Sequence, residues 1–295
     1  MAIVSVPKAK STLRKHEQKI WTRNELFQLI DENLEGWEAA KDAEDAIELP
    51  SRSRTTVLNA LVRETPLTPI TLKFPYRSVT RYAYGEVPTF AIIQSVDAQG
   101  YFSHYTAMQI HGLTEQIPKS VYFNVEQPAT GGGGSLSQRA IDNAFKGKCR
   151  VTNNVIEFRG LTIHKINGQN TEQLGVVEQE QDDGVTIQVT NLERTLIDIA
   201  VRPVYSGGIG EVAHAYRIAA EKVSGNRIAT YLKSLNYTYP YHQVIGYYMT
   251  RAGNYSHSQI SRLKTIPIDF DFYIDYQLKN PVLNKEWRLF VPKGF

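Results

Sequence analysis

The spacing of apolar side chains predicts helices in the N-terminal third of the chain. One helix is expected at about residues 12–20. A second helix begins after Thr22, because Glu25 lies three residues later and completes a capping box. Its apolar stripe consists of Leu26, Leu29 and Ile30. A third helix is expected within residues 51–64, and its buried side consists of Val57, Leu58, Leu61 and Val62.

Three short runs rich in β-branched and aromatic residues follow these helices. They cover residues 68–74, 78–84 and 89–96, and turn-forming residues separate them, so each run predicts a strand. Helices followed by a small hairpin are the order of a winged helix-turn-helix. The boundary of this first domain is expected near residues 95–101, where turn-forming residues gather.

The rest of the chain predicts a larger domain. A short helix is expected from Ser103 to Ile110, and the chain becomes mainly helical after residue 190. Strands are expected at residues 120–126, 156–166, 174–180, 186–190, 268–276 and 286–291. The predicted fold class is α+β, with an N-terminal winged helix-turn-helix at residues 1–97 and a larger mixed α/β domain at residues 98–295.

Composition and charge limit the class of protein. The 295 residues are 42% hydrophobic and 21% charged, as in globular proteins. The sequence has no apolar run of about 18 residues and no signal peptide pattern, so a soluble cytoplasmic protein is expected. Charge alternates in blocks of +5, −8 and +5 over residues 1–23, 24–48 and 51–85. Such blocks indicate that different faces of the first domain meet different partners.

Two glycine-rich stretches and the single cysteine match functional motifs only in part. Residues 131–134 are four glycines without the Gly-Lys-Ser/Thr of a phosphate loop, which favours a loop, with Ser135 and Gln138 capping the next helix. Residues 206–211 favour a turn between helices over a dinucleotide fingerprint. Cys149 lies among three cations, and a structural cysteine is favoured over a reactive thiol.

Two further patterns resemble active sites. Ser103 and His104 are adjacent, but neighbouring side chains on a helix point about 100° apart, so they are not expected to pair, and Ser103 is expected to cap the helix. His104 and His111 are two helical turns apart, about 10 Å, which is too far for one metal ion.

In residues 190–203, Thr190 and Glu193 predict a capping box. The i, i+4 ion pairs expected there are Arg194–Asp198 and Asp198–Arg202.

Three carboxylates alternate with apolar residues near the C-terminus. Asp269, Asp271 and Asp275 would share one face of a strand, as in a magnesium site or on an ordinary solvent face. The solvent face is favoured, because antiparallel sheets usually expose one polar side. A metal-dependent enzyme acting on nucleotides or nucleic acid is therefore the alternative interpretation.

A basic stretch gives the clearest functional prediction. Arginines precede the third helix and basic side chains line the following hairpin, so phosphate contacts are expected from both. The short polar side chains at the start of the third helix suit contacts with base edges. The predicted DNA-binding residues are Arg52, Arg54, Thr55, Thr56, Asn59, Arg63, Lys73, Arg77 and Arg81. A solvated basic surface without a ligand is the other interpretation, and nucleic acid is favoured.

Four segments of the chain are informative in combination: "YFSHYTAMQIHGLTEQIPKSVYF", "VTNLERTLIDIAVRPVYSGGIGEV", "QVIGYYMTRAG" and "NKEWRLFVP". Together they resemble the AbiEi family, the antitoxin half of type IV toxin-antitoxin and phage-defence operons. They cover roughly residues 100–292 in the family's order and spacing, whereas the N-terminal third matches only as a winged helix. The acidic segment at residues 31–48 departs from a compact helix-turn-helix, because it is an unusually long spacer.

The resemblance implies a transcriptional autorepressor and antitoxin without catalytic activity, cofactor or metal. Its winged helix would bind inverted repeats in double-stranded DNA upstream of its operon, where two copies could dimerise. Its functional partner would be a nucleotidyltransferase-like toxin, counteracted without a stable complex. No membrane association is expected.

Overall fold

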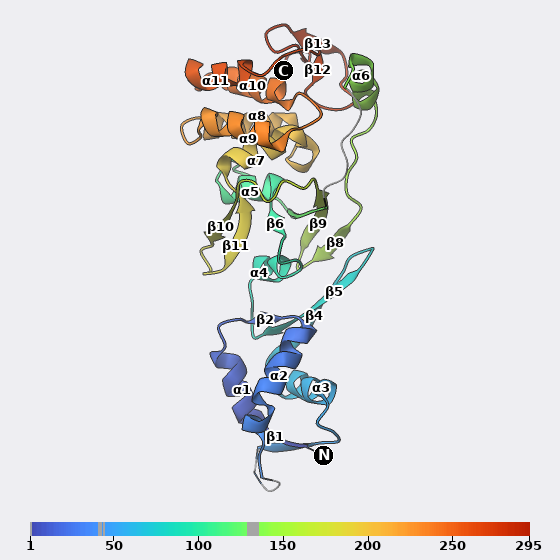
Figure 1. Ribbon diagram of the computed structural model, residues 1–295, viewed down its shortest axis with the longest axis vertical. Coiled ribbons are helices and arrows are strands. Elements are labelled where there is room, and N and C mark those ends of the chain that lie inside the picture. Colours follow the sequence, from blue (N-terminus) through green and yellow to red (C-terminus); the bar gives the residue numbers. More distant parts are fainter. Residues whose placement is uncertain (1, 41–42, 44, 129–135) are drawn as a thin grey trace. The chain divides into compact units, whose positions relative to one another are not determined.

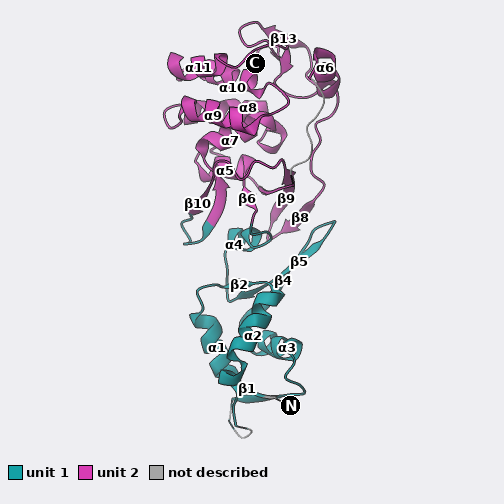
Figure 2. Ribbon diagram, in the orientation of Figure 1, with its two compact units in different colours: residues 1–98, 180–186 teal, residues 99–179, 187–295 magenta. Residues whose placement is uncertain are grey.

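The computed structural model describes residues 2–40, 43, 45–128 and 136–295. The chain divides into two compact units, residues 1–98 with 180–186, and residues 99–179 with 187–295 (Figure 2). Both units combine helices with β-sheet, so the predicted α+β class is confirmed. The glycines at 131–134 and Ser135 lie outside the described residues. The prediction that Ser135 caps the next helix is wrong, because that helix is capped by Ser137, whose hydroxyl accepts from the Ala140 amide at 3.3 Å.

The first unit contains helices and two small sheets (Figure 1). Its elements are β1 (Ala2–Ser5), α1 (Val6–Lys15), β2 (Ile20–Trp21), α2 (Arg23–Trp37), β3 (Ala46–Leu49), α3 (Arg54–Glu64), β4 (Leu67–Lys73), β5 (Ser78–Tyr84) and α4 (Thr89–Gln94). The strands β2, β5 and β4 form an antiparallel sheet in that order, and β1 pairs with β3.

Local sequence signals explain the helices of this unit. The capping box at the start of α2 is confirmed, because the Thr22 hydroxyl accepts from the Glu25 amide at 3.2 Å and the Glu25 carboxylate accepts from the Thr22 amide at 2.6 Å. The helices α1, α2 and α3 then bury their apolar faces in one core. Its buried side chains include Leu13, Trp21, Leu26, Ile30, Trp37, Val57, Leu58 and Leu61.

Four predictions for the first unit are corrected. The helix expected at 12–20 is α1, which starts earlier because Pro7 suits a first helical turn. The run at 89–96 is not a strand: α4 begins there after Pro88, and the third strand of the sheet is β2. The acidic segment at 31–48 is not only a spacer, because α2 continues to Trp37 and β3 pairs with β1. Val62 is only partly buried.

The second unit begins with a six-stranded mixed sheet. Its elements are β6 (Tyr101–Phe102), α5 (His104–Ile110), β7 (Ser120–Glu126), α6 (Gln138–Lys146), β8 (Val155–Phe158), β9 (Leu161–Gly168), β10 (Val176–Glu180) and β11 (Thr186–Thr190). The strand order is β10-β11-β6-β7-β9-β8, with β7 parallel to β9 and β6 parallel to β11. The expected strands at 120–126 and 186–190 are confirmed, and the run at 156–166 forms the β8–β9 hairpin.

Helices and a small sheet complete this unit. They are α7 (Leu192–Val201), a 3-10 turn (Pro203–Tyr205), α8 (Ile209–Ala219), α9 (Gly225–Leu235), α10 (Tyr241–Ala252), α11 (His257–Lys264), β12 (Phe272–Tyr273), β13 (Pro281–Asn284) and β14 (Leu289–Pro292). The turn predicted at 206–211 lies between the 3-10 turn and α8, where Gly207 and Gly208 have φ of 78° and 88°. The expected strand at 268–276 is reduced to β12, and β13 was not predicted.

The central helix α10 holds the C-terminal sheet in place. The Gln243 side-chain amide donates to the carbonyls of Phe270, Trp287 and Arg288, at 2.6–3.1 Å. Gly246 gives the Trp287 ring room, because a Cβ at this position would lie 2.2 Å from the ring. The three hydrogen bonds and the close packing of the Trp287 ring fix the position of the last strands on α10.

Candidate nucleic-acid interface

The helix α3 has one buried side and one exposed polar side. Val57, Leu58 and Leu61 are buried in the core of the first unit. Thr55, Asn59 and Arg63 are exposed, and their spacing of four residues places them in one row, which we call the outer face of α3. A helix anchored in this way presents its polar row on a rigid support.

The start of α3 is held by serine and threonine side chains. The Ser53 hydroxyl accepts from the Thr56 amide at 3.2 Å. The Thr56 hydroxyl lies 2.8 Å from that of Ser53 and 2.9 Å from that of Ser51. Of the predicted DNA-binding residues, Thr56 therefore serves the helix cap, whereas Thr55 belongs to the outer face.

Two predicted arginines form ion pairs with α2. Arg54 contacts Asp31 through two nitrogens, with Nε–Oδ1 at 2.9 Å and an NH2–Oδ2 distance of 2.6 Å. Arg52 forms an ion pair with Glu38. All four side chains are about half exposed, and exposed pairs contribute little to stability, typically about 0–1 kcal/mol. Such pairs can be exchanged for contacts with a ligand.

The β4–β5 hairpin carries the remaining predicted residues. The two strands pair along their full length, and the Thr71 and Thr80 hydroxyls are 2.9 Å apart across them. Lys73 and Arg77 flank the tip and are exposed, as is Tyr76, with 70% of its surface accessible. The hairpin therefore presents two cations and an aromatic ring at one end.

Arg81 has a different role from the other predicted residues. Its guanidinium donates to the carbonyls of Ser95 at 2.8 Å, Val96 at 3.1 Å and Thr80 at 3.0 Å. Burial lowers the pKa of this side chain. These contacts attach the segment after α4 to the hairpin. Arg81 therefore stabilises the first unit and is not part of the proposed DNA interface.

Arg23 is a candidate residue that the sequence prediction missed. It is the first residue of α2, its NH2 group donates to the Thr55 hydroxyl at 3.3 Å, and its guanidinium lies 5.0 Å from the centre of the Phe27 ring. It therefore borders the outer face of α3 from the neighbouring helix. The first helix of a helix-turn-helix crosses the DNA backbone, and a cation at its start is the signal that could have identified Arg23.

The three C-terminal aspartates do not form a cluster. Asp271 accepts from Arg288 Nε at 2.7 Å, and Asp275 accepts from the backbone amide of Tyr276 at 2.8 Å. Burial raises the pKa of Asp275. Within residues 2–40, 43, 45–128 and 136–295, no group of three His, Cys, Asp or Glu side chains could hold a metal ion. The alternative interpretation therefore lacks a ligand set in the part of the chain described.

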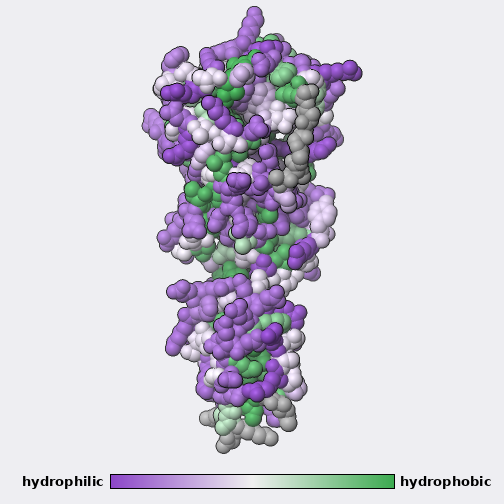
Figure 3. Space-filling model, in the orientation of Figure 1, coloured by the Kyte–Doolittle hydropathy of each residue, from purple (hydrophilic) through white to green (hydrophobic). Residues whose placement is uncertain are grey.

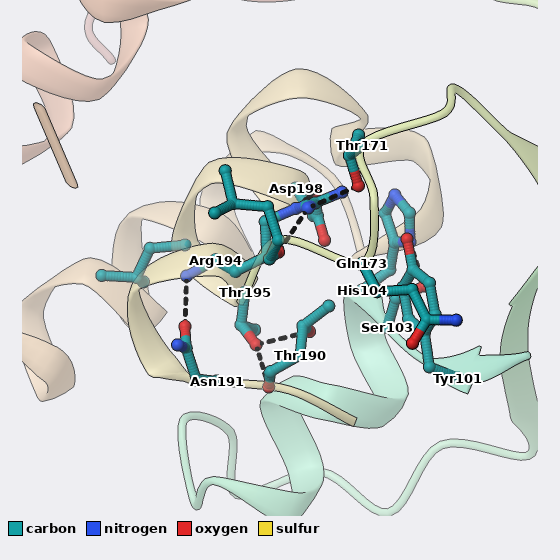
Figure 4. A network of polar contacts seen from close by, with 12 residues as sticks. Tyr101, Ser103, His104, Thr171, Gln173, Thr190, Asn191, Arg194, Thr195 and Asp198 are labelled. Carbon is teal, nitrogen blue, oxygen red and sulfur yellow. Dashed lines mark hydrogen bonds and ion pairs between the residues drawn. The ribbon is translucent and has the colours of Figure 1, made fainter. Parts of the chain in front are cut away.

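The expectation that Ser103 and His104 cannot pair is wrong. Ser103 Oγ lies 2.8 Å from His104 Nδ1, and both residues are buried (Figure 4). His104 has a φ of 52°, so the angular spacing of a regular helix does not apply between these residues. Ser103 makes no side-chain cap. Burial lowers the pKa of His104 to about 4, so the neutral imidazole fills an interior position. His111 instead contacts the Thr190 carbonyl at 2.6 Å.

The helix α7 carries a buried ion pair beside these residues (Figure 4). The predicted Arg194–Asp198 pair is confirmed, with Nε–Oδ1 at 2.8 Å and side chains 5% and 8% exposed. Arg194 also donates to the Leu174 carbonyl at 2.7 Å and to the Thr171 hydroxyl at 3.1 Å. These contacts fasten the loop before β10 to α7, which indicates a structural network.

The ends of α7 differ from the prediction. The cap is Asn191, whose side chain accepts from the Arg194 amide at 3.0 Å, and not Thr190. Glu193 accepts from the Ser224 amide at 3.0 Å and so joins α7 to the start of α9. Arg202 donates to the Arg150 carbonyl at 3.0 Å and lies 3.6 Å from the half-buried Cys149 sulfur. The segment after α6 is thereby attached to the end of α7.

The surface offers little sign of a large apolar interface on the face seen in Figure 3. Hydrophilic residues cover most of it, and the hydrophobic ones lie in small separate groups. Contiguous apolar patches mark many permanent protein interfaces. Among the described residues, no helix is long and apolar enough to cross a membrane.

Comparisons with known proteins give information on the fold and none on the function. No family model matches the chain, and no curated protein matches it. The chain is similar to a solved structure, the crystal structure of RV2827C protein from Mycobacterium tuberculosis, with a TM-score of 0.59 and 14% sequence identity. The similarity covers 97% of this chain and 90% of that chain, so the fold is shared over nearly the full length.

Proposed function

We propose that this protein is a DNA-binding transcriptional autorepressor whose first unit is a winged helix-turn-helix. The observation that carries the proposal is the outer face of α3, a polar and basic row on a helix that α2 supports. The order α1, β2, α2, β3, α3, β4, β5 and the sheet order β2-β5-β4 are consistent with helices followed by a β-hairpin wing, with the short β3, paired to β1, between α2 and α3.

In this proposal α3 enters the major groove of double-stranded DNA. Asn59 suits the paired donor and acceptor of an adenine edge, and Thr55 and Arg63 flank it on the same row. Arg23 and Arg52 lie near the start of α3, and Lys73 and Arg77 lie on the hairpin, where cations would contact phosphates. In this arrangement α3 would read the bases, and the cations at its start and on the hairpin would contact the phosphate backbone.

The antitoxin role rests on the resemblance of residues 100–292 to the AbiEi family. We propose that the second unit counteracts a nucleotidyltransferase-like toxin without a stable complex and without catalysis of its own. The proposed partner is a nucleotidyltransferase-like protein encoded beside this chain's gene, and co-expression with such a protein tests this role. We expect restored growth and no co-purification; growth arrest despite high levels of both proteins would contradict the antitoxin role and leave DNA binding untouched.

Binding to the DNA upstream of the chain's own gene tests the repressor role. We expect tighter binding to this duplex than to an unrelated duplex of equal length, by roughly 10³-fold or more. Replacing Asn59 with Ala removes a base-reading amide and is expected to reduce operator affinity by about 1–3 kcal/mol. The matched control is Asn143→Ala, an exposed asparagine on α6. Equal affinity for both duplexes would refute the repressor role.

A salt series separates phosphate contacts from base contacts. Arg52→Ala is expected to reduce the slope of log affinity against log salt by about 1, because one phosphate contact is lost. Lys293→Ala, an exposed cation in the second unit, serves as the control. A metal-dependent enzyme is not proposed, because Asp271 is already paired with Arg288.

A further inference from the structure

The contact between Arg54 and Asp31 uses one edge of the guanidinium. Nε and NH2 of Arg54 each meet one oxygen of the Asp31 carboxylate, at 2.9 and 2.6 Å. A guanidinium has five N–H donors in a planar fork, and this contact takes two of them. The NH1 group and the second N–H of NH2 form the other edge, which points away from the carboxylate.

The remaining edge has the geometry to read a base. Two parallel N–H groups of an arginine match the O6 and N7 acceptors of guanine in the major groove. Arg54 is the first residue of α3, and the N-terminal residues of a recognition helix contact base edges. The side chain is 58% exposed, so it is accessible to a ligand.

We propose that Arg54 reads a guanine and that Asp31 is the positioning residue that sets the plane of its guanidinium. The inference rests on the proposed function and adds the base and the residue that decide specificity. A carboxylate that holds the fork before binding reduces the side-chain entropy lost on binding. Binding to non-specific DNA depends only on the charge of Arg54, so the orientation of the guanidinium does not change that affinity.

Two neighbouring features provide contrast with the Arg54–Asp31 contact. Arg52 precedes α3 and forms an ion pair with Glu38, which can be exchanged for a contact with a phosphate. Glu35 is exposed on α2 and takes part in none of the ion pairs found among the described residues. Glu35→Gln therefore makes the same charge change as Asp31→Asn without touching Arg54.

A randomised duplex DNA library, selected with the full-length protein, tests the inference. The selected site is then varied one base pair at a time and bound to the wild type and to the Asp31→Asn, Arg54→Lys and Glu35→Gln variants. We expect one guanine whose replacement weakens wild-type binding by about 5- to 150-fold. This preference should disappear in Arg54→Lys, which keeps the charge but loses the fork, and fall sharply in Asp31→Asn.

The control separates positioning from a general effect of charge. Glu35→Gln should strengthen binding to all sequences alike and keep the guanine preference. The inference is overturned if Asp31→Asn behaves like Glu35→Gln, or if Arg54→Lys keeps every base preference. A library that yields no enriched duplex overturns the proposed DNA-binding function itself. Thermal unfolding of each variant confirms that the exposed substitutions leave the first unit folded.

Discussion

The buried Arg194–Asp198 pair gives a stability prediction for the second unit. Replacing Asp198 with Asn keeps the shape of the side chain but leaves the Arg194 guanidinium, only 5% exposed, without its counter-charge. Breaking a buried pair in this way costs about 3–5 kcal/mol. Because a domain is stable by about 5–15 kcal/mol in total, the loss is a large fraction of the free energy of unfolding.

Urea unfolding followed by Trp287 fluorescence measures this loss. Trp21 and Trp37 lie in the first unit, so they are replaced by Phe and the signal then comes from the second unit. In that background we expect Asp198→Asn to lower the unfolding free energy by about 3–5 kcal/mol. The exposed Asp269→Asn should change it by less than about 0.5 kcal/mol.

A small effect of Asp198→Asn would refute the reasoning. If the free energy of unfolding falls by less than about 1 kcal/mol, the pair behaves as an exposed one. The carbonyl of Leu174 and the hydroxyl of Thr171 would then suffice to hold Arg194. A second variant, Thr171→Val, removes one of those contacts and should cost about 1 kcal/mol by itself.

Two further predictions concern the same unit. Burial lowers the pKa of His104 and of His242 to about 4, from an ordinary value of 6.5, so the neutral forms stabilise the fold. This stability is present above pH 6.5 and is lost as the pH falls toward 4, by up to about 3 kcal/mol for each histidine. The urea concentration at the midpoint of unfolding should therefore fall between pH 7 and pH 4.5. A midpoint that does not change with pH would contradict the burial of both rings. Gly246→Ala places a methyl group against the Trp287 ring and should destabilise the unit by about 1–3 kcal/mol or more, seen as a lower melting temperature, whereas Gly210→Ala meets open space and serves as the control.

The sequence predicted those elements whose determinants are local. The capping box of Thr22 and Glu25 and the i, i+4 pair of Arg194 and Asp198 join residues close together in the chain, so their spacing is a sufficient signal. The strand at 120–126 was predicted from its β-branched and aromatic residues, although its partners in the sheet are distant in the chain.

The elements that were missed depend on distant partners. Residues 89–96 have the composition of a strand, yet Ile92 and Ile93 are fully buried in a short helix. Burial in the folded unit overrides a weak local preference. The contact of Ser103 with His104 requires a positive φ that no pattern of side chains reveals. Among the predicted DNA-binding residues, Arg81 could not be separated from the others because its carbonyl partners follow a helix that the sequence did not predict.

The pairing of Gln138 with Asp271 has a consequence for the order of folding. The Gln138 side chain donates to the Asp271 carbonyl and accepts from the Asp271 amide, both at 2.8 Å, across 133 residues of chain. Contacts between such distant positions form late, because a long loop must close first. During synthesis on the ribosome, α6 emerges long before its partner. A chain that stops before Asp271 leaves α6 without this contact, so α6 reaches its final position only when most of the second unit has been made.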